Sequence, residues 1–204
     1  MAIKICILDY KSGNVGSVFN IIKYMGYNCK ISNEEKDLED ASHIILPGVG
    51  SFKKSMKKIK ENIPIKKLEE QILKKKKPFL GICVGMQVLA EKGNEFGIEN
   101  GLGWIEGEVN ILKTENLPLP HICWNSINIK NKSELTKNLE GINDFYFVHS
   151  YKFDVKNEDE INARTEYGEN FCSIVNKDNI YGVQFHPEKS QKSGMILLKN
   201  FINI

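Results

Sequence analysis

Residues 81–85 of this chain, Gly-Ile-Cys-Val-Gly, place Cys83 between two glycines in the pattern of a nucleophile elbow. The segment follows an apolar run, 79–82, that predicts a buried strand, and it precedes residues 86–92, which predict a helix. The two glycines suit the sharp turn, because they leave no Cβ atoms around the exposed side chain. A thiol at a helix N-terminus is favoured as the thiolate. We therefore expect Cys83 to act as a nucleophile.

A nucleophile needs a base and a group that orients the base. Of the four histidines, His186 is the best placed, because it follows a predicted buried strand, 181–185, and Pro187 ends that strand. Glu188 comes two residues later and can accept a hydrogen bond from the imidazole. A Cys-His-Glu triad of this kind holds the ring in one tautomer and stabilises the imidazolium. The alternative is a small core cysteine and a satisfied histidine, which is disfavoured because both residues end strands.

The spacing of apolar residues predicts an α/β fold. In the first half, strands and helices alternate, which indicates a doubly wound, mainly parallel sheet with helices on both faces. After Gly103 the runs are typical of mixed or antiparallel strands, and we expect one domain over residues 1–204. The expected strands are 3–8, 29–32, 44–46, 79–82, 105–112, 127–129, 145–153, 171–175 and 180–185, and the expected helices include 15–25, 86–92 and 193–202.

Composition excludes several classes of protein. The chain has 204 residues, of which 41% are hydrophobic, and no apolar run reaches membrane length. Its first eight residues are expected to form a strand and not a signal peptide. Five cysteines without a C-x-x-C pair favour a reducing, cytoplasmic compartment, and Cys6, Cys29 and Cys172 are interpreted as core residues. The spacing of His121 and Cys123 matches no common zinc pattern, so we expect no metal.

Lysines gather between residues 53 and 77, which raises the possibility of nucleic-acid binding. However, Phe52, Met56 and Ile59 recur between them at helical spacing, and acidic residues lie nearby. The lysines are therefore interpreted as the solvated faces of two amphipathic helices, and nucleic acid is not expected as a partner.

Three motifs together resemble the class I, triad-type glutamine amidotransferases: 46–52 (LPGVGSF), 81–87 (GICVGMQ) and 184–190 (QFHPEKS). Three more resemble, within that class, the glutaminase subunit of imidazole glycerol phosphate synthase. These are 9–14 (DYKSGN) with Ser17 and Val18, 120–125 (PHICWN) and 146–151 (YFVHSY). The resemblance runs from residue 9 to the C-terminus.

The resemblance implies a glutaminase that needs no cofactor. The loop Gly48, Val49 and Gly50 would supply part of an oxyanion hole, with the N–H of Val84 as the other donor. The substrate L-glutamine would be held by residues of two segments, namely Gln87, Gly85, His149, Ser150 and Tyr151. If the peptide before Val49 must turn over to aim its N–H at the oxyanion, strain at this β-branched residue would keep the resting hole incomplete.

The resemblance also implies a partner, a (β/α)8-barrel cyclase in a heterodimer. The cyclase would use the ammonia to convert a phosphoribulosyl-aminoimidazole carboxamide ribotide into imidazole glycerol phosphate and a second ribotide. The residues expected at this interface or along the ammonia path are Asn14, Ser17, His121, Trp124, Asn125 and Lys189.

Two departures from the family pattern bear on the partner. Lys11 stands where a small residue is usual and Cys123 where glycine is common, both in expected partner-facing loops. The chain could therefore be a paralogous glutaminase whose ammonia builds an amidine on a surface-glycan sugar. It could also be a stand-alone γ-glutamyl cysteine hydrolase, which would share the triad. An inactive interaction module is disfavoured, because the triad residues are all present.

Overall fold

A computed structural model describes residues 3–204 of the chain. Strands and helices alternate through its first half, as the sequence predicts. The elements are β1 (Ile5–Ile7), α1 (Val15–Tyr24), β2 (Cys29–Ile31), α2 (Glu35–Asp40), β3 (His43–Gly48), α3 (Phe52–Asn62), α4 (Ile65–Glu69) with a π-helical continuation (Glu70–Lys74), β4 (Phe79–Cys83) and α5 (Val84–Gln87).

The second half is mostly strands. It contains β5 (Lys92–Gly93), β6 (Glu99–Asn100), β7 (Gly107–Ile111), β8 (His121–Ser126), β9 (Asn128–Ile129), β10 (Asp144–His149), β11 (Tyr151–Val155), β12 (Ile161–Tyr167), β13 (Glu169–Lys177), β14 (Ile180–Val183) and the final helix α6 (Gln191–Ile202). Single 3-10 turns lie at Glu134–Thr136, Glu158–Glu160 and Pro187–Lys189.

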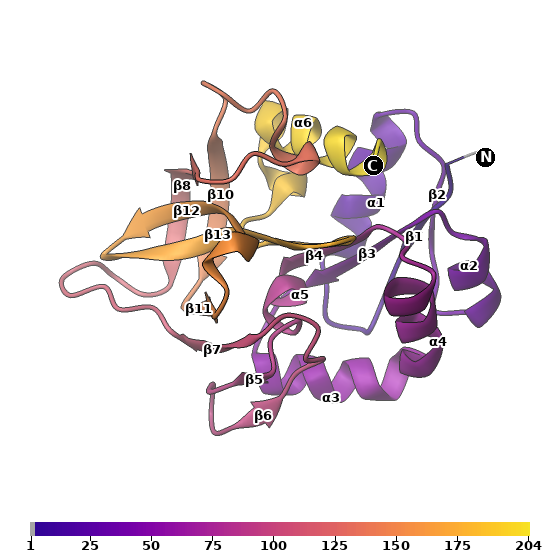
Figure 1. The fold of residues 1–204 in the computed structure, drawn as a ribbon, viewed down its shortest axis with the longest axis horizontal. Coiled ribbons are helices and arrows are strands. Elements are labelled where there is room, and N and C mark those ends of the chain that lie inside the picture. The colour runs from indigo at the N-terminus through magenta and orange to yellow at the C-terminus, as the bar shows by residue number, and fades with distance from the viewer. Residues whose placement is uncertain (1–2) are drawn as a thin grey trace.

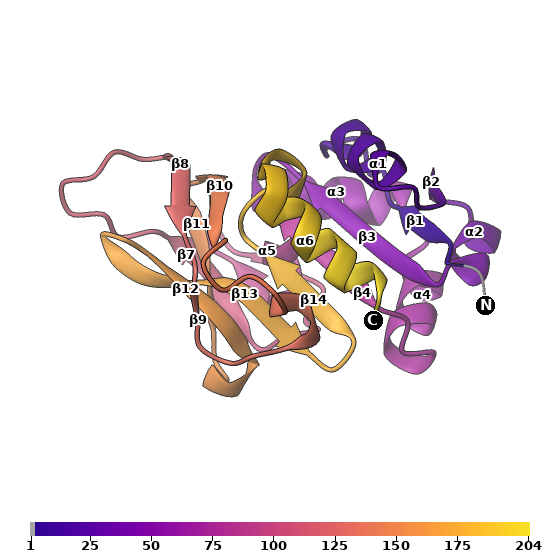
Figure 2. The same cartoon turned by 90° about the horizontal axis from the view of Figure 1, so that it is seen from above.

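The central sheet has eight strands in the order β2-β1-β3-β4-β14-β13-β12-β9. The first five are parallel, and β13, β12 and β9 continue the sheet in antiparallel fashion. Helices α1 and α6 cover one face, and α3 and α4 cover the other (Figures 1 and 2). This arrangement confirms the predicted mainly parallel α/β sheet with added antiparallel strands. Its strands β3 and β4 are buried throughout, as expected of a sheet covered on both faces.

Two small sheets accompany the central sheet: β8 and β10 lie beside β12 and β13, whereas β5 and β6 lie beside α3 (Figure 1). One pairs β8 with β10, and the other has the order β11-β7-β5-β6. The predicted single strand over 145–153 was wrong, because the chain breaks at Ser150 and its two halves, β10 and β11, join different sheets. Cys123 was expected in a loop but lies within β8, whereas Lys11 lies in a loop with a positive φ of 64°.

The helix predicted over 86–92 is also wrong. The observed helix α5 ends at Gln87, and Lys92 begins a strand. The carbonyls of residues 88–90, which would continue the helix, instead accept hydrogen bonds from the backbone N–H groups of residues 102–105. Residues 102–105 therefore supply the N–H donors that a continued helix would have supplied to residues 88–90.

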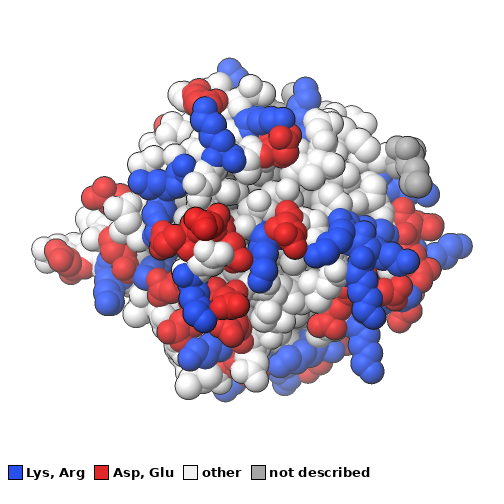
Figure 3. Space-filling model, in the orientation of Figure 1, with Lys and Arg blue, Asp and Glu red and all other residues white. Residues whose placement is uncertain are grey.

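Lysine side chains lie on the solvated surface, interspersed with acidic ones (Figure 3). Lys67 pairs with Glu39 and Glu70, and Lys60 pairs with Glu99. The hydrophobic residues between the lysines, such as Met56 and Ile59, are buried. These contacts agree with the interpretation of α3 and α4 as amphipathic helices. Among the helices of residues 3–204, none is long and apolar enough to cross a membrane.

Candidate active site

Cys83 is the last residue of β4, between the carboxyl ends of β3 and β14. Its backbone has φ 55° and ψ −112°, a conformation that L-residues rarely adopt. The glycines on either side permit this turn. A Cβ on Gly81 would lie 2.3 Å from the carbonyl oxygen of Gly85, and a Cβ on Gly85 would lie 1.9 Å from that of Leu46. Such a conformation costs on the order of 1 to 3 kcal/mol, and it places the thiol side chain at the tip of the turn.

His186 lies just beyond the end of β14 and is buried. Its Nδ1 lies 2.9 Å from Oε1 of Glu188, and the same oxygen accepts a hydrogen bond of 3.0 Å from Nδ2 of Asn14. The backbone N–H of His186 donates to the carbonyl oxygen of Tyr146. Asn14, which was expected at the partner interface or ammonia path, thus also orients the carboxylate behind the histidine.

The charge state of His186 is set by opposing effects. Burial lowers its pKa, but attraction to Cys83 and hydrogen bonds with Cys83 and Glu188 outweigh burial and raise the pKa to about 10. The raised pKa favours the imidazolium form of the ring beside the Cys83 sulfur. The sulfur also accepts a hydrogen bond of 3.7 Å from Nε2 of Gln184, whose own carbonyl is fixed by Gln87.

The loop after β3 is turned away from the sulfur. The N–H of Val49 donates to the carbonyl oxygen of Ser12 at 3.1 Å, and the Ser12 hydroxyl donates to the carbonyl oxygen of Val49 at 3.0 Å. Gly50 has a positive φ of 103°, whereas Val49 does not. The N–H of Val84 belongs to the first turn of α5, where N–H groups have no intrahelical partner. Of the two predicted oxyanion donors, the N–H of Val49 is therefore already engaged in this conformation.

A cavity of about 490 Å³ opens onto Cys83 and His186. It is lined by most of the residues predicted to hold the substrate, namely Gln87, His149, Ser150 and Tyr151, together with Val49, Gly50, Val84 and Lys189. Gly85 is the exception: it is buried against Leu46 and does not line the cavity, because its role is to let α5 approach β3. Gly48 is likewise packed inward, beside Tyr10 and the Val84–Gly85 peptide.

Sequence reasoning missed Glu95, which lines the same cavity from the loop between β5 and β6. One of its carboxylate oxygens accepts a 2.7 Å hydrogen bond from the backbone N–H of Phe52. Burial raises the pKa of Glu95 because it disfavours the charged carboxylate, and a cationic group bound in the cavity would offset that cost. Phe96, beside it, has a positive φ of 56° and lies at the cavity mouth. No local motif marks Glu95, because only the returning loop brings it to the cavity.

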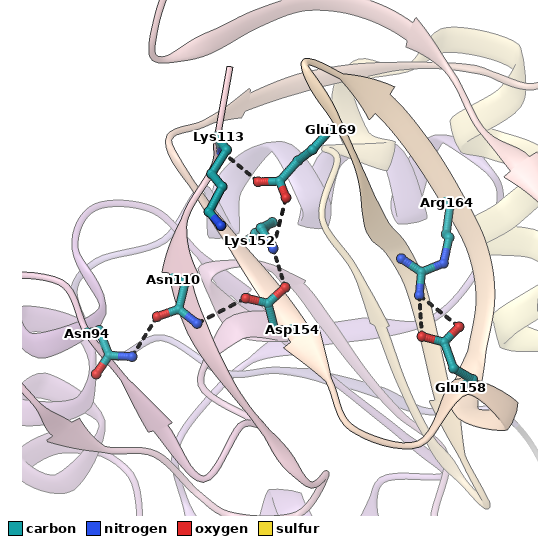
Figure 4. Close-up of polar contacts among 8 residues, drawn as sticks. All are labelled: Asn94, Asn110, Lys113, Lys152, Asp154, Glu158, Arg164 and Glu169. Atoms are coloured by element: carbon teal, nitrogen blue, oxygen red, sulfur yellow. Dashed lines mark hydrogen bonds and ion pairs between the residues drawn. The ribbon is translucent and has the colours of Figure 1, made fainter. Parts of the chain in front are cut away.

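A chain of polar contacts supports the strands behind the cavity (Figure 4). Lys152, whose side chain is 10% exposed, pairs with Asp154 and with Glu169. Asp154 accepts a 3.0 Å hydrogen bond from Asn110, which in turn accepts one of 2.6 Å from Asn94. These contacts join β11 and β7 to the loop that carries Glu95. They therefore hold two sides of the cavity, at Tyr151 and Glu95, in one arrangement.

The residues predicted for the partner face fall into two groups. Trp124 is 45% exposed on β8 and lies 6.1 Å from the Tyr146 ring between centroids, while Ser17 is half-buried on α1. His121 is instead fully buried on the opposite side of β8. Asn125 donates to the carbonyl oxygen of Glu166. His121 is thus a core residue beneath the face that exposes Trp124.

No group of three or more His, Cys, Asp or Glu side chains suited to a metal ion occurs within residues 3–204. All five cysteines are free. The chemistry that the geometry offers is a cysteine nucleophile, a cationic histidine and backbone N–H donors beside a polar cavity. This set suits attack on a carbonyl carbon and release of an amine.

The sequence matches the family model for class I glutamine amidotransferases over residues 6–204. Imidazole glycerol phosphate synthase subunit HisH 1 of Campylobacter jejuni (strain RM1221) is 46% identical, with 98% of this chain and all of that protein covered. Imidazole glycerol phosphate synthase subunit HisH 2 of Pseudomonas aeruginosa is 40% identical, over 98% of this chain and 99% of that protein. Among solved structures, PurLQS from Thermotoga maritima has a TM-score of 0.75 at 17% identity, with 100% and 99% of the two chains covered, which shows a shared fold.

Proposed function

Because the chain belongs to the class I glutamine amidotransferase family, we propose that it is the glutaminase subunit of imidazole glycerol phosphate synthase. The observation that carries the proposal is the arrangement of Cys83, His186 and Glu188 at the edge of one cavity, in a chain 46% identical to a protein of that name. The whole described chain would then work as one glutaminase domain. Five free cysteines suit a reducing compartment, and we assign the enzyme to the cytoplasm.

The reaction follows from the charge states at the site. The Cys83 thiolate attacks the side-chain amide carbon of glutamine, and the His186 imidazolium gives its proton to the departing ammonia. Formation of the C–S bond gives a tetrahedral oxyanion, and the collapse of this intermediate breaks the C–N bond and leaves a γ-glutamyl thioester. His186, now neutral, takes a proton from water, and the resulting hydroxide attacks the thioester, so that glutamate leaves and the thiolate returns. Glu188 holds the ring in the orientation that both steps need.

The cavity has groups that match the two ends of the substrate. The Glu95 carboxylate suits the α-ammonium of L-glutamine, and Ser150 and Tyr151 line the same cavity. Gln87 is held by the carbonyl oxygen of Tyr151 and by Gln184, so its amide is fixed before the substrate arrives. We assign substrate orientation to these groups.

The ammonia needs a protected route, because free ammonia at pH 7 is mostly protonated and does not act as a nucleophile. We propose a (β/α)8-barrel cyclase as the partner, in a heterodimer, with the face around Trp124 and Tyr146 toward it. The exposure of Trp124 and the names of the relatives support this assignment. Lys189 lines the cavity and lies 5.9 Å from the Tyr146 ring, so it joins the cavity to that face.

The test is the Cys83→Ala variant in complex with the cyclase. We expect no glutamine hydrolysis, while added ammonium salt at high pH still yields imidazole glycerol phosphate. The wild-type complex should use both nitrogen sources. Glutamine hydrolysis by the variant would remove Cys83 from its role, and a complex that uses neither source would exclude this partner.

A second candidate is a paralogous glutaminase that supplies ammonia for an amidine on a surface-glycan sugar. Lys11 favours it, because this departure from the family pattern lies in an exposed loop of a segment expected to face the partner. Growth of a histidine-requiring strain that lacks its own glutaminase subunit separates the two. Restored growth without histidine supports the synthase subunit, and failure with a soluble, active glutaminase supports the second candidate.

A further inference from the structure

The side chain of Tyr10 is fully buried directly behind residues 48–50, which we call the oxyanion loop. Its hydroxyl nevertheless has no hydrogen-bond partner in the part of the chain that the structure describes. A Cβ placed on Gly48 would lie 2.5 Å from this hydroxyl. The Val49 N–H and the Ser55 side chain lie near enough to influence the pKa of Tyr10, without making a hydrogen bond of ordinary geometry. A buried hydroxyl without a partner is uncommon and calls for an explanation.

The neighbouring peptide supplies a complementary observation. The peptide between Gly48 and Val49 now points its N–H toward Ser12 and Tyr10. To serve an oxyanion at Cys83, this peptide must turn over, and a planar trans peptide exchanges the directions of its N–H and C=O when it does so. The Gly48 carbonyl would then face the Ser12 carbonyl, which is a second acceptor. A buried carbonyl without a hydrogen-bond donor costs free energy, so the turned state needs a donor beside the Gly48 carbonyl oxygen.

We propose that the Tyr10 hydroxyl donates a hydrogen bond to the Gly48 carbonyl oxygen when the oxyanion loop turns. Tyr10 would thus be a positioning residue for glutamine hydrolysis. The inference rests on the proposed function, because it concerns the state in which Val49 serves the oxyanion. Ser12 cannot take this role, since its hydroxyl already donates to the carbonyl oxygen of Val49. Burial raises the pKa of Tyr10, so the phenol stays protonated and able to donate.

This arrangement explains why the hydroxyl is unpaired in the resting conformation. Its partner is a carbonyl that arrives only when the loop turns. The stabilisation therefore acts on the active conformation and not on the fold, which is the condition for an interaction that raises kcat without changing substrate affinity.

The test compares Tyr10→Phe with Tyr181→Phe, a matched loss of a hydroxyl from a buried tyrosine on β14 outside the cavity. Both variants are assayed as the complex with the cyclase, and their melting temperatures are measured. We expect Tyr10→Phe to lower kcat for glutamine about tenfold, with KM within about twofold and an unchanged melting temperature. The Tyr181→Phe complex should keep the wild-type kcat.

A second measurement, the affinity for an inhibitor, tests the turned state of the loop without catalytic turnover. An aldehyde analogue of glutamine forms a hemithioacetal with Cys83, in which the new C–S bond turns the aldehyde oxygen into an oxyanion or hydroxyl at the site. Its affinity for Tyr10→Phe should fall by the same factor as kcat. A kcat within about twofold of wild type, or a loss of kcat that accompanies a lower melting temperature, would overturn the role of Tyr10.

The wild-type complex distinguishes this inference from the proposed function. If wild type hydrolyses glutamine and Tyr10→Phe does so equally well, only the role of Tyr10 fails. If wild type does not hydrolyse glutamine at all, the proposed function fails, and the inference fails with it.

Discussion

His121 on β8 and His149 on β10 lie directly opposite each other and share a hydrogen bond of 3.0 Å between Nδ1 and Nε2. Nδ1 of His149 faces the carbonyl oxygen of Tyr151 at 2.9 Å and must donate to it, so its Nε2 accepts from His121. The far nitrogen of His121 lies 3.4 Å from the Asn125 amide, which donates to it. Both rings are therefore neutral, each in one tautomer, and they connect β8 to the wall of the cavity that opens onto Cys83.

The pair predicts a loss of stability in mild acid. Burial lowers the pKa of His121 to about 4 and that of His149 to about 3, both below the ordinary value of 6.5. In the unfolded chain these histidines bind protons first, so the stability they contribute is present above pH 6.5 and is lost as the pH falls toward 4. We expect up to about 2 kcal/mol lost per histidine at pH 5. Denaturant unfolding at pH 7 and pH 5 measures this loss.

The control is His121→Gln, in which an amide can still donate to His149. With one buried histidine fewer, the loss of stability between the two pH values should shrink by up to about 2 kcal/mol. An equal pH dependence in this variant and wild type would contradict the assignment.

The contacts of the triad predict unequal losses. His186→Ala removes the proton donor for ammonia, so glutamine hydrolysis should fall by about 10⁴-fold or more. Glu188→Gln keeps an oxygen that can accept from Nδ1 and loses only the charge, so some activity should remain. Steady-state kcat with glutamine measures both. Equal, negligible effects of the two changes would point to a different histidine.

The hydrogen bond between Val49 and Ser12 predicts that a substitution can raise resting activity. Val49→Gly removes the β-branch that resists a positive φ, so the loop should turn more easily. Glutaminase activity without the partner should rise about tenfold for each roughly 1.4 kcal/mol of strain relieved. Free and partner-bound rates must both be measured, because glycine also loosens the loop. Unchanged or lower resting activity, in a folded protein whose complex works, would contradict this coupling.

Trp124 predicts where the partner binds. Its replacement by alanine should weaken association with the cyclase by about 2 kcal/mol or more, since it is an exposed aromatic anchor. The matched control is Tyr24→Ala, an exposed aromatic side chain on α1. Calorimetric titration gives the affinities. A lower melting temperature with unchanged affinity would place the role of Trp124 in folding instead.

The strands that carry the triad could be predicted from sequence, whereas some of the elements around the site could not. Residues 79–82 and 180–183 are short apolar runs next to glycine or proline, and such signals are local. Strand β8 was missed because its polar residues and its exposed Trp124 form a strand only when β10 pairs with it. The helix predicted over 86–92 failed for the same kind of reason, since residues 102–105 take up its carbonyls. Glu95 reaches the cavity through a loop, which no periodicity marks.

The place of β14 in the central sheet has a consequence for synthesis on the ribosome. This strand lies between β4 and β13, although both precede it in sequence. Until residues 180–183 emerge, β4 lacks one neighbour and presents an open sheet edge, a form prone to pair with other chains. His186 and Glu188 emerge later still. A nascent chain therefore exposes the edge of β4 before it can hydrolyse glutamine. The segment that covers this edge, β14, is followed directly by the residues that complete the triad.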